Sequence, residues 1–381
     1  MIFSVQPIDL KNLFSAIKKI PVNKVMPIYD YVLFRPTEDG TGFVVIATDG
    51  ECTCSVRMPV DEAQDLKPVL VARDFLSDFI GGALNEWPVT FDIDKSGNLV
   101  ISDILGEFRT LANLDVSEFP VIQSIENSAA IDIDANLLVE TTTLALPFMA
   151  DDKLRPIMNG VNFDFRADGL RVSASDSKRL YHDVISDVVA DGNPRITLPG
   201  KIAKCVAGLL HTGEEEKVSV VYNDKMIGFS QAGIRIIGCL LEGKYPNVEA
   251  ILPKNSDKVV TVEREKILSV IKRVLIGAAD QDKLVKVTFD GNTSLYIETR
   301  DEDFGRSASA VCDTVSQSGI EESFTMSFRG DALMKNISVF RKSDTVTFFM
   351  TERFRAMVIK SSPDSHRLAL GMPYVDSSAK N

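Results

Sequence analysis

The chain has 381 residues, of which 45% are apolar and 25% charged, an ordinary composition for a globular protein with a sizeable core. It has 42 Lys and Arg against 54 Asp and Glu, a net charge of −12, which argues against a generally basic nucleic-acid binder but allows a local basic surface. No apolar run reaches the ~18 residues of a membrane helix, the N-terminus becomes charged too early for a signal peptide, and five cysteines without metal-ligand spacing suit a reducing compartment. We therefore expect a cytoplasmic protein without membrane contact, metal or cofactor.

The first predicted elements are a short strand and an amphipathic helix in FSVQPIDLKNLFSAIKKI, which starts at Phe3. Alternating strands around a Gly-rich turn follow at 32–60, then a helix at 71–83 and a hairpin at 89–103. In that hairpin, Asp92, Asp94 and Asp103 superficially match a calcium loop. Because β-patterned runs flank them rather than helices, we interpret the segment as a hairpin turn.

The same order of elements occurs three times along the chain. Strand–helix segments recur at 129–146 and 258–275, and second helices at 198–210 and 328–340. Arg73, Lys201 and Arg329 start these second helices at intervals of 128 residues. The pattern predicts an α+β fold of three repeated domains, 1–127, 128–256 and 257–381, each with two helices on antiparallel sheet.

Enzyme signatures are absent from the sequence: it has no P-loop, nucleophile elbow or zinc-protease motif, and its three histidines lie in different segments. A hydrolase with an unfamiliar site is therefore disfavoured, and we expect a non-enzymatic protein. Lys and Arg recur on the predicted helices. They indicate either solvated helix faces or a local surface that contacts phosphates without reading sequence.

Several segments resemble the bacterial DNA polymerase III beta subunit, the replication sliding clamp, and the resemblance covers essentially the whole chain. The sharpest matches are RPIMNGV from Arg155, SASDSKRL from Ser173, EGKYP from Glu242 and the C-terminal Met372-Pro373-Tyr374. The corresponding runs of the family contain Leu-Asn-Gly, Ala-Thr-Asp-Gly-His-Arg-Leu, Asp-Gly-(Lys/Arg)-Phe-Pro and Met-Pro-Met. Order, spacing and repeat period agree.

The resemblance implies a homodimeric ring of six domains that encircles duplex DNA and increases polymerase processivity. Its implied partners are double-stranded DNA without sequence preference, the DNA polymerase III alpha subunit, clamp-loader subunits, and other DNA polymerases and repair proteins that carry clamp-binding motifs. The implied DNA contacts are Lys24, Arg73, Arg155, Lys201 and Lys254. Asp74 and Ile157 replace family residues that often assist at such positions.

The resemblance also implies an apolar pocket between the second and third repeats for short linear motifs of partner proteins. Its expected members are Met158, Ser175, Ser177, Lys178, Arg179, Leu180, Pro246, Ile251, Phe354, Met372, Pro373 and Tyr374. Ser177-Lys178 replaces the family's Gly-His, Phe354 is bulkier than the usual aliphatic residue, and Ala250 stands where Arg is common.

For the subunit interface, the resemblance implies contact of Phe108 and Leu111 with Leu275 and Ile276 of a second copy. The alternative from another class is a monomeric three-domain β-rich scaffold that binds peptides or carbohydrate and does not encircle DNA. The oligomeric state and the trapping of circular DNA separate these two hypotheses.

Overall fold

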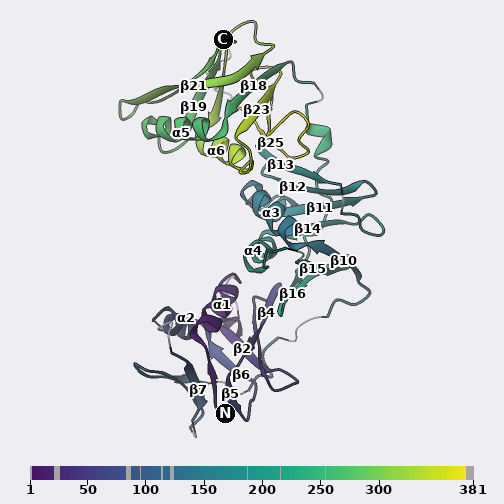
Figure 1. Cartoon of the computed structure of the whole chain (residues 1–381), viewed down its shortest axis with the longest axis vertical. Coiled ribbons are helices and arrows are strands. Elements are labelled where there is room, and N and C mark those ends of the chain that lie inside the picture. Colours follow the sequence, from purple (N-terminus) through teal and green to yellow (C-terminus); the bar gives the residue numbers. More distant parts are fainter. Residues whose placement is uncertain are drawn as a thin grey trace. The chain divides into compact units, whose positions relative to one another are not determined.

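A computed structural model describes residues 2–20, 26–82, 87–94, 96–112, 115–120, 124–186, 188–214, 216–253 and 255–374 (Figure 1). The chain divides into two compact units, each made of two stretches of sequence. Unit 1 comprises Met1–Thr143 and Leu198–Glu242, and unit 2 comprises Leu144–Thr197 and Gly243–Asn381.

The α-helices confirm the predicted pattern of two helices in each repeat. They are α1 (Pro7–Ile17), α2 (Arg73–Gly82), α3 (Ala135–Ala145), α4 (Gly200–Leu209), α5 (Arg264–Val274) and α6 (Gly330–Ser338). The repeated cations lie where these helices begin: Arg73 is the first residue of α2, Lys201 the second of α4, and Arg329 immediately precedes α6. Short 3-10 turns are η1 (Pro27–Asp30), η2 (Leu146–Phe148), η3 (Pro156–Met158), η4 (Glu249–Ile251) and η5 (Leu275–Gly277).

Unit 1 contains two antiparallel sheets. The five-stranded sheet has the order β5-β1-β7-β8-β9, and the eight-stranded sheet has the order β10-β15-β16-β17-β4-β3-β2-β6. The strands of the first repeat are β1 (Ile2–Val5), β2 (Tyr31–Pro36), β3 (Gly42–Thr48), β4 (Cys52–Pro59), β5 (Glu62–Gln64), β6 (Val69–Ala72), β7 (Val89–Ile93), β8 (Asn98–Asp103) and β9 (Gly106–Leu111). The others are β10 (Ala129–Asp134), β15 (Lys217–Tyr222), β16 (Met226–Gln231) and β17 (Ile234–Cys239).

The core of unit 1 is built from the buried faces of these strands and of α1, α2 and α4. The stacked rings of Phe3 and Phe91, with centroids 4.8 Å apart, join β1 to β7, and Phe43 of β3 packs against Phe3 at 4.7 Å. Helix α1 packs against β4, α2 and α4. Aromatic burial of this kind is a large part of the hydrophobic stabilisation of a domain.

Unit 2 contains one chain of twelve hydrogen-bonded strands, in the order β14-β11-β12-β13-β25-β24-β23-β18-β21-β20-β19-β22. Helices α5 and α6 pack side by side in this unit (Figure 1). Its strands are β11 (Gly160–Arg166), β12 (Gly169–Ser175), β13 (Arg179–Ile185), β14 (Arg195–Pro199), β18 (Lys258–Glu263), β19 (Leu284–Phe289), β20 (Ser294–Asp301), β21 (Arg306–Ser318), β22 (Phe324–Arg329), β23 (Thr345–Met350), β24 (Met357–Lys360) and β25 (Leu368–Gly371).

Strand pairing continues across the predicted domain boundaries. In unit 1, β17 pairs with β4, placing Ile236 opposite Cys54, and in unit 2, β13 pairs with β25, placing Leu180 opposite Leu370. These seams are continuous sheet, so contacts between neighbouring repeats are as close as those within a repeat. This explains why compactness divides the chain into two units, whereas the sequence repeats three times. The boundaries near 127 and 256 stay a prediction.

Local polar contacts explain two predicted features. The side chain of Asp134 accepts the backbone N–H of Leu137 at 2.8 Å, as expected for a carboxylate at the start of a helix. Asp94 accepts the backbone N–H groups of Ser96 and Asn98 between β7 and β8, which is hairpin-turn geometry, as we interpreted this segment. Among the described residues, no helix combines the length and apolarity that crossing a bilayer requires.

Candidate partner groove and nucleic-acid surface

A groove of about 600 Å³ opens in unit 2 beside the C-terminal strand. We call it the C-terminal groove. Three segments form it: the turn between β12 and β13, the first turns of α6 with the end of β22, and the residues that follow β25. Its lining residues are Asp176, Lys178, Arg179, Asp282, Phe328, Arg329, Asp331, Ala332, Leu333, Lys335, Asn336, Gly371, Met372, Pro373 and Tyr374.

Asp176 organises the turn between β12 and β13. One carboxylate oxygen accepts the backbone N–H groups of Lys178 and Arg179 at 3.0 and 2.7 Å. The other accepts the guanidinium of Arg179 through Nε and Nη2 at 2.9 and 2.7 Å. Ser177, at the apex, has a φ of +75°, a backbone conformation that favours glycine. Ser177 therefore occupies a position where glycine would be less strained.

The C-terminal residues are held on both sides of the C-terminal groove by backbone hydrogen bonds. Met372 N–H donates to the carbonyl of Lys178 at 2.8 Å, and Tyr374 N–H donates to the carbonyl of Ser327 at 2.7 Å. The side chains of Met372 and Tyr374 remain 45% and 50% exposed. Exposed apolar side chains on a fixed backbone suit the burial of apolar anchors from another chain.

Charged side chains surround these apolar residues in the lining of the groove. Arg179 is paired with Asp176, and Arg329 lies 3.3 Å from Asp331. Within the described part of the chain, Lys178 and Lys335 have no carboxylate within ion-pair distance, and both are exposed. The rim therefore carries two available positive charges.

The structure brings five of the twelve expected pocket residues into the lining of the C-terminal groove: Lys178, Arg179, Met372, Pro373 and Tyr374. Others lie close by. Leu180 is 1% exposed in an apolar cluster with Tyr245, Val248, Val358, Leu368 and Leu370. The lining of the groove also lacks the other six expected residues, Met158, Ser175, Ser177, Pro246, Ile251 and Phe354.

Met158 is 5% exposed, and its sulfur lies 3.9 Å from the hydroxyl oxygen of Ser177. The hydroxyl of Ser175 donates to the carbonyl of Arg179 and thus supports the turn. Ile251 and Phe354 are 57% and 45% exposed but do not line the C-terminal groove. Phe354 carries the guanidinium of Arg353 over its ring at 4.9 Å.

Pro246 lines a different, much smaller cavity. The assignment of these three residues, Pro246, Ile251 and Phe354, to a partner pocket stays a prediction.

The sequence reasoning missed the wall that α6 provides. Arg329 and Lys335 belong to the helix cations that the sequence indicates only as solvated charges or as phosphate contacts. Helix α6 packs against β25, so its first turns face the same opening as Met372. The repeated position of Arg329 at a helix start was the available signal.

Arg73, an expected DNA contact, is only 7% exposed in unit 1. Its Nη2 donates to the carbonyl oxygens of Ile17 and Ile20, just beyond the end of α1. Burial lowers the pKa of this guanidinium, although the negative charges of Asp30 and Asp49 oppose that effect. These contacts give Arg73 an internal role, and we do not propose it as a DNA contact.

The other expected DNA contacts differ in their exposure and in their ion pairs. Lys201 donates to Asp49 at 2.8 Å and also pairs with Glu51, and these partners raise the pKa of its ammonium against the effect of burial. Arg155 is exposed and pairs with Asp152 at 2.9 Å. Lys24 and Lys254 lie outside the described residues.

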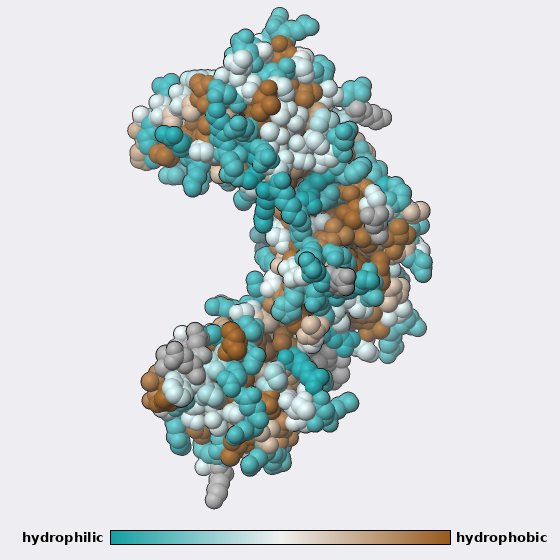
Figure 2. Space-filling model, viewed as in Figure 1, coloured by the Kyte–Doolittle hydropathy of each residue, from teal (hydrophilic) through white to brown (hydrophobic). Residues whose placement is uncertain are grey.

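The expected interface residues lie at exposed positions. Phe108 and Leu111 belong to β9, the edge strand of the five-stranded sheet, and are 42% and 77% exposed. Phe108 packs edge-on against Phe79 of α2, with ring centroids 5.2 Å apart. In η5 of unit 2, Leu275 is half-buried and Ile276 is 77% exposed. More widely, the visible surface is largely hydrophilic with separate apolar patches (Figure 2).

Comparison with known proteins gives consistent matches. The family model described as the central domain of the DNA polymerase III beta subunit matches residues 134–247, and that of its C-terminal domain matches 249–375. The beta sliding clamp of Bacillus subtilis is 24% identical over 345 residues, which cover 87% of this chain and 90% of the relative. That of Synechococcus elongatus is 22% identical, covering 70% and 71%.

Solved structures show the same fold. The sliding clamp of Bacillus subtilis matches with a TM-score of 0.86 and 20% identity, covering 99% of both chains. The beta subunit of Thermotoga maritima matches with a TM-score of 0.87 and 20% identity, covering 99% of this chain and all of the other. A sliding clamp from Pseudomonas aeruginosa bound to griselimycin matches with a TM-score of 0.88 and 19% identity over the same shares.

Proposed function

Because the chain belongs to the DNA polymerase III beta subunit family, the bacterial beta sliding clamps, we propose that it acts in replication as a processivity factor. It holds DNA polymerases on duplex DNA and catalyses no reaction itself. Its partners are duplex DNA, the alpha subunit of DNA polymerase III, clamp-loader subunits, and other polymerases and repair proteins. We place it in the cytoplasm, where these partners act.

The C-terminal groove carries the proposal for partner binding. Met372 and Tyr374 present half-exposed side chains from a backbone fixed at Lys178 and Ser327. An extended peptide with Leu and aromatic anchors could bury those anchors here while its polar groups meet the charged rim. A buried apolar cluster around Leu180 lies next to this surface, because Leu180 directly follows Arg179 in β13.

DNA contact is proposed for cations at helices and loops rather than for a specific base-reading site. Lys204 on α4 and Lys272 and Arg273 on α5 are exposed, and Arg155 is exposed beside its acidic partner. We retain Lys24, Lys201 and Lys254 from the family resemblance. Phosphate attraction of this kind is weak, independent of sequence and sensitive to salt, so it permits sliding.

Homodimerisation is proposed through sheet edges. Strand β9 ends one sheet and exposes Leu111, while β21 pairs with β20 from Arg306 to Asp313 and meets β18 only from Thr314 onward, within the described residues. The first half of β21 therefore has an edge available to a strand of a second copy. Ile276 supplies an exposed apolar contact near that edge.

The experiment is loading of the purified protein onto nicked circular DNA by its own clamp loader, followed by a high-salt wash and linearisation of the circle. Retention on the circle and loss from the linear molecule are expected, because a closed ring is linked to DNA by topology. Sedimentation should give a dimer. Equal removal of the protein from circles and linear DNA by salt, together with a monomeric mass, would favour the peptide- or carbohydrate-binding scaffold.

A further inference from the structure

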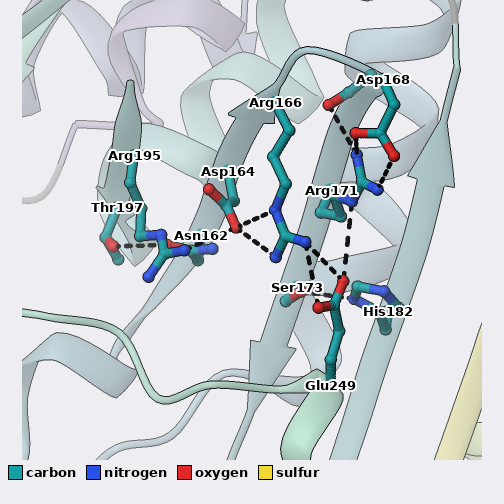
Figure 3. A network of polar contacts seen from close by, with 11 residues as sticks. Asn162, Asp164, Arg166, Asp168, Arg171, Ser173, His182, Arg195, Thr197 and Glu249 are labelled. Atoms are coloured by element: carbon teal, nitrogen blue, oxygen red, sulfur yellow. Dashed lines mark hydrogen bonds and ion pairs between the residues drawn. The ribbon is translucent and has the colours of Figure 1, made fainter. Parts of the chain in front are cut away.

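A compact polar network lies in unit 2 on strands β11, β12, β13 and β14 and on the short helix η4 (Figure 3). Its cavity is about 20 Å³, smaller than any organic substrate, and its lining includes a Ser173–His182 pair joined at 2.9 Å. Burial lowers the pKa of His182. The cavity has room for about one water molecule beside this pair, and ionic contacts make up most of the surrounding network.

Glu249 is the only member of the labelled network that comes from the linker segment, residues 243–252, which leads from the second repeat toward the third. Arg166 at the end of β11 donates through Nη1 to both carboxylate oxygens of Glu249, at 2.9 and 3.1 Å. On β12, Arg171 places Nε 3.9 Å from the same carboxylate. Two neighbouring strands therefore hold one side chain of the linker segment.

Both arginines are oriented before they meet Glu249. Asp164 accepts Nε and Nη2 of Arg166 at 3.0 and 2.9 Å. Asp168 accepts both terminal nitrogens of Arg171 at 2.6 Å, and Arg171 is only 8% exposed. Its buried Nε has no hydrogen-bond partner within the described residues, and the carboxylate of Glu249 lies 3.9 Å from it. Pre-oriented guanidinium groups lose little entropy when they bind a carboxylate.

The linker segment also supplies apolar side chains to the cluster of Leu180, the residue after Arg179 of the proposed partner surface. Tyr245 and Val248 are buried in the cluster that contains Leu180, and Leu252 packs against it. Val248 directly precedes Glu249. The backbone from Val248 to Glu249 thus joins the ionic contacts on β11 and β12 to the apolar cluster of Leu180, which directly follows the groove residue Arg179 in β13.

We propose that Arg166, Arg171 and Glu249 form a clasp that positions the linker segment, and through Tyr245 and Val248 sets the partner-binding surface. These are positioning residues, and the proposal rests on the proposed function for its partner-binding consequence. Arg166 and Glu249 are 35% and 44% exposed, so their ion pair adds modest stability, while its several partners favour one arrangement of the linker segment. The clasp therefore adjusts affinity for partner peptides from a site that the peptide does not touch.

The test compares full-length Glu249→Gln with the unmodified protein. Amide hydrogen exchange of residues 243–252 should rise about tenfold in the variant because the linker segment opens locally more often. Affinity for a fluorescent synthetic peptide with Leu and Phe anchors should fall about fivefold. Glu249→Asp, which keeps the carboxylate, should lose less than half as much as Glu249→Gln in both measurements.

Glu302→Gln is the matched control, because Glu302 pairs with Arg300 at 3.8 Å in the turn after β20 and lines neither the C-terminal groove nor the small cavity of the network. It should leave exchange in 243–252 and peptide affinity unchanged. Unchanged exchange in Glu249→Gln, or raised exchange without loss of affinity, would overturn the proposal. Failure of the unmodified protein to remain on circular DNA or to bind peptide would instead overturn the proposed function, and the exchange measurement would still decide whether the clasp exists.

Discussion

The backbone N–H of Met372 donates to the carbonyl oxygen of Lys178 at 2.8 Å. This bond fixes the C-terminal residues against the turn between β12 and β13, although the two partners are far apart in sequence. Two residues later, Tyr374 is held by Ser327. The side chains of the C-terminal groove are therefore presented from a backbone that is ordered before any partner arrives, which reduces the entropy lost on binding.

Tyr374→Ala should weaken binding of a Leu- and Phe-anchored peptide about tenfold, because a half-exposed aromatic side chain in a fixed position is a typical anchor contact. Fluorescence anisotropy measures the affinity. Tyr296→Ala is the matched control, since Tyr296 is 42% exposed on β20 and does not line the C-terminal groove. Equal affinities for both variants would exclude Tyr374 from the partner contact.

The double variant Lys178→Glu with Lys335→Glu should bind a peptide with acidic residues beside its anchors about tenfold more weakly, because two positive charges of the rim become negative. A peptide with the same anchors and neutral flanks should lose less. Titration at low and high salt checks the electrostatic origin, because the difference should shrink as salt rises. Lys272→Glu, outside the C-terminal groove, is the control, and an equal loss there would refute a local effect.

Ser177→Gly should stabilise the protein by about 1 kcal/mol, because Ser177 has a φ of +75° and glycine adopts this conformation without a Cβ penalty. Ser177→Val should destabilise it. Urea denaturation followed by circular dichroism gives both values. The reverse order of stability would show that the hydroxyl of Ser177, near the sulfur of Met158, matters more than the backbone conformation.

Arg73→Met should lower the free energy of unfolding of unit 1 by about 2 kcal/mol or more, because the carbonyl groups of Ile17 and Ile20 lose a charged donor in a buried place. Arg155→Met removes an exposed ion pair and should cost less than about 1 kcal/mol. Denaturant titration compares the two. Normal stability of Arg73→Met with faster loss from DNA would restore Arg73 as a DNA contact.

A fall in pH should weaken the hydrogen bonds by which Asp164 holds Arg166. Burial alone would raise the pKa of Asp164, but hydrogen bonds from Arg195 and Arg166 outweigh it, and the pKa lies below the ordinary 3.8. The stabilisation is therefore present above about pH 4 and is lost as the pH falls through the lowered pKa. Asp164→Asn should be less stable at pH 7 by about 2 kcal/mol, with the difference shrinking toward pH 3.

Denaturation of this variant at pH 7 and pH 3 checks that prediction. Asp191→Asn, an exposed loop aspartate, serves as the control. A deficit of Asp164→Asn that stays constant with pH would mean that packing, and not the carboxylate charge, stabilises this place.

The repeat and its helices could be predicted because periodicity is local. The apolar spacing of each helix, and the 128-residue interval between Arg73, Lys201 and Arg329, lie within the sequence itself. The burial and the ion pairs of these cations could not be predicted in the same way. Arg73 is buried because its guanidinium binds the carbonyl at the end of α1. Lys201 forms ion pairs because the turn between β3 and β4 places Asp49 and Glu51 beside it.

Only part of the lining of the C-terminal groove could be predicted from the sequence, for a related reason. The family resemblance identified Lys178, Arg179 and Met372 by position. The wall formed by Arg329 and Lys335 depends on the packing of α6 against β25, which no alternating pattern specifies. Similarly, Glu249 and Arg166 are 83 residues apart, and each alone has the sequence character of an ordinary surface charge.

The seams between repeats have a consequence for how this chain can be divided or recombined. Strand β17 of the central repeat completes the sheet of β4, and β13 completes that of β25. Cutting the gene at the repeat boundaries would leave each fragment with a bare strand edge that can capture another chain. Exchange of the central repeat for a relative's would need two hydrogen-bond registers to match at once.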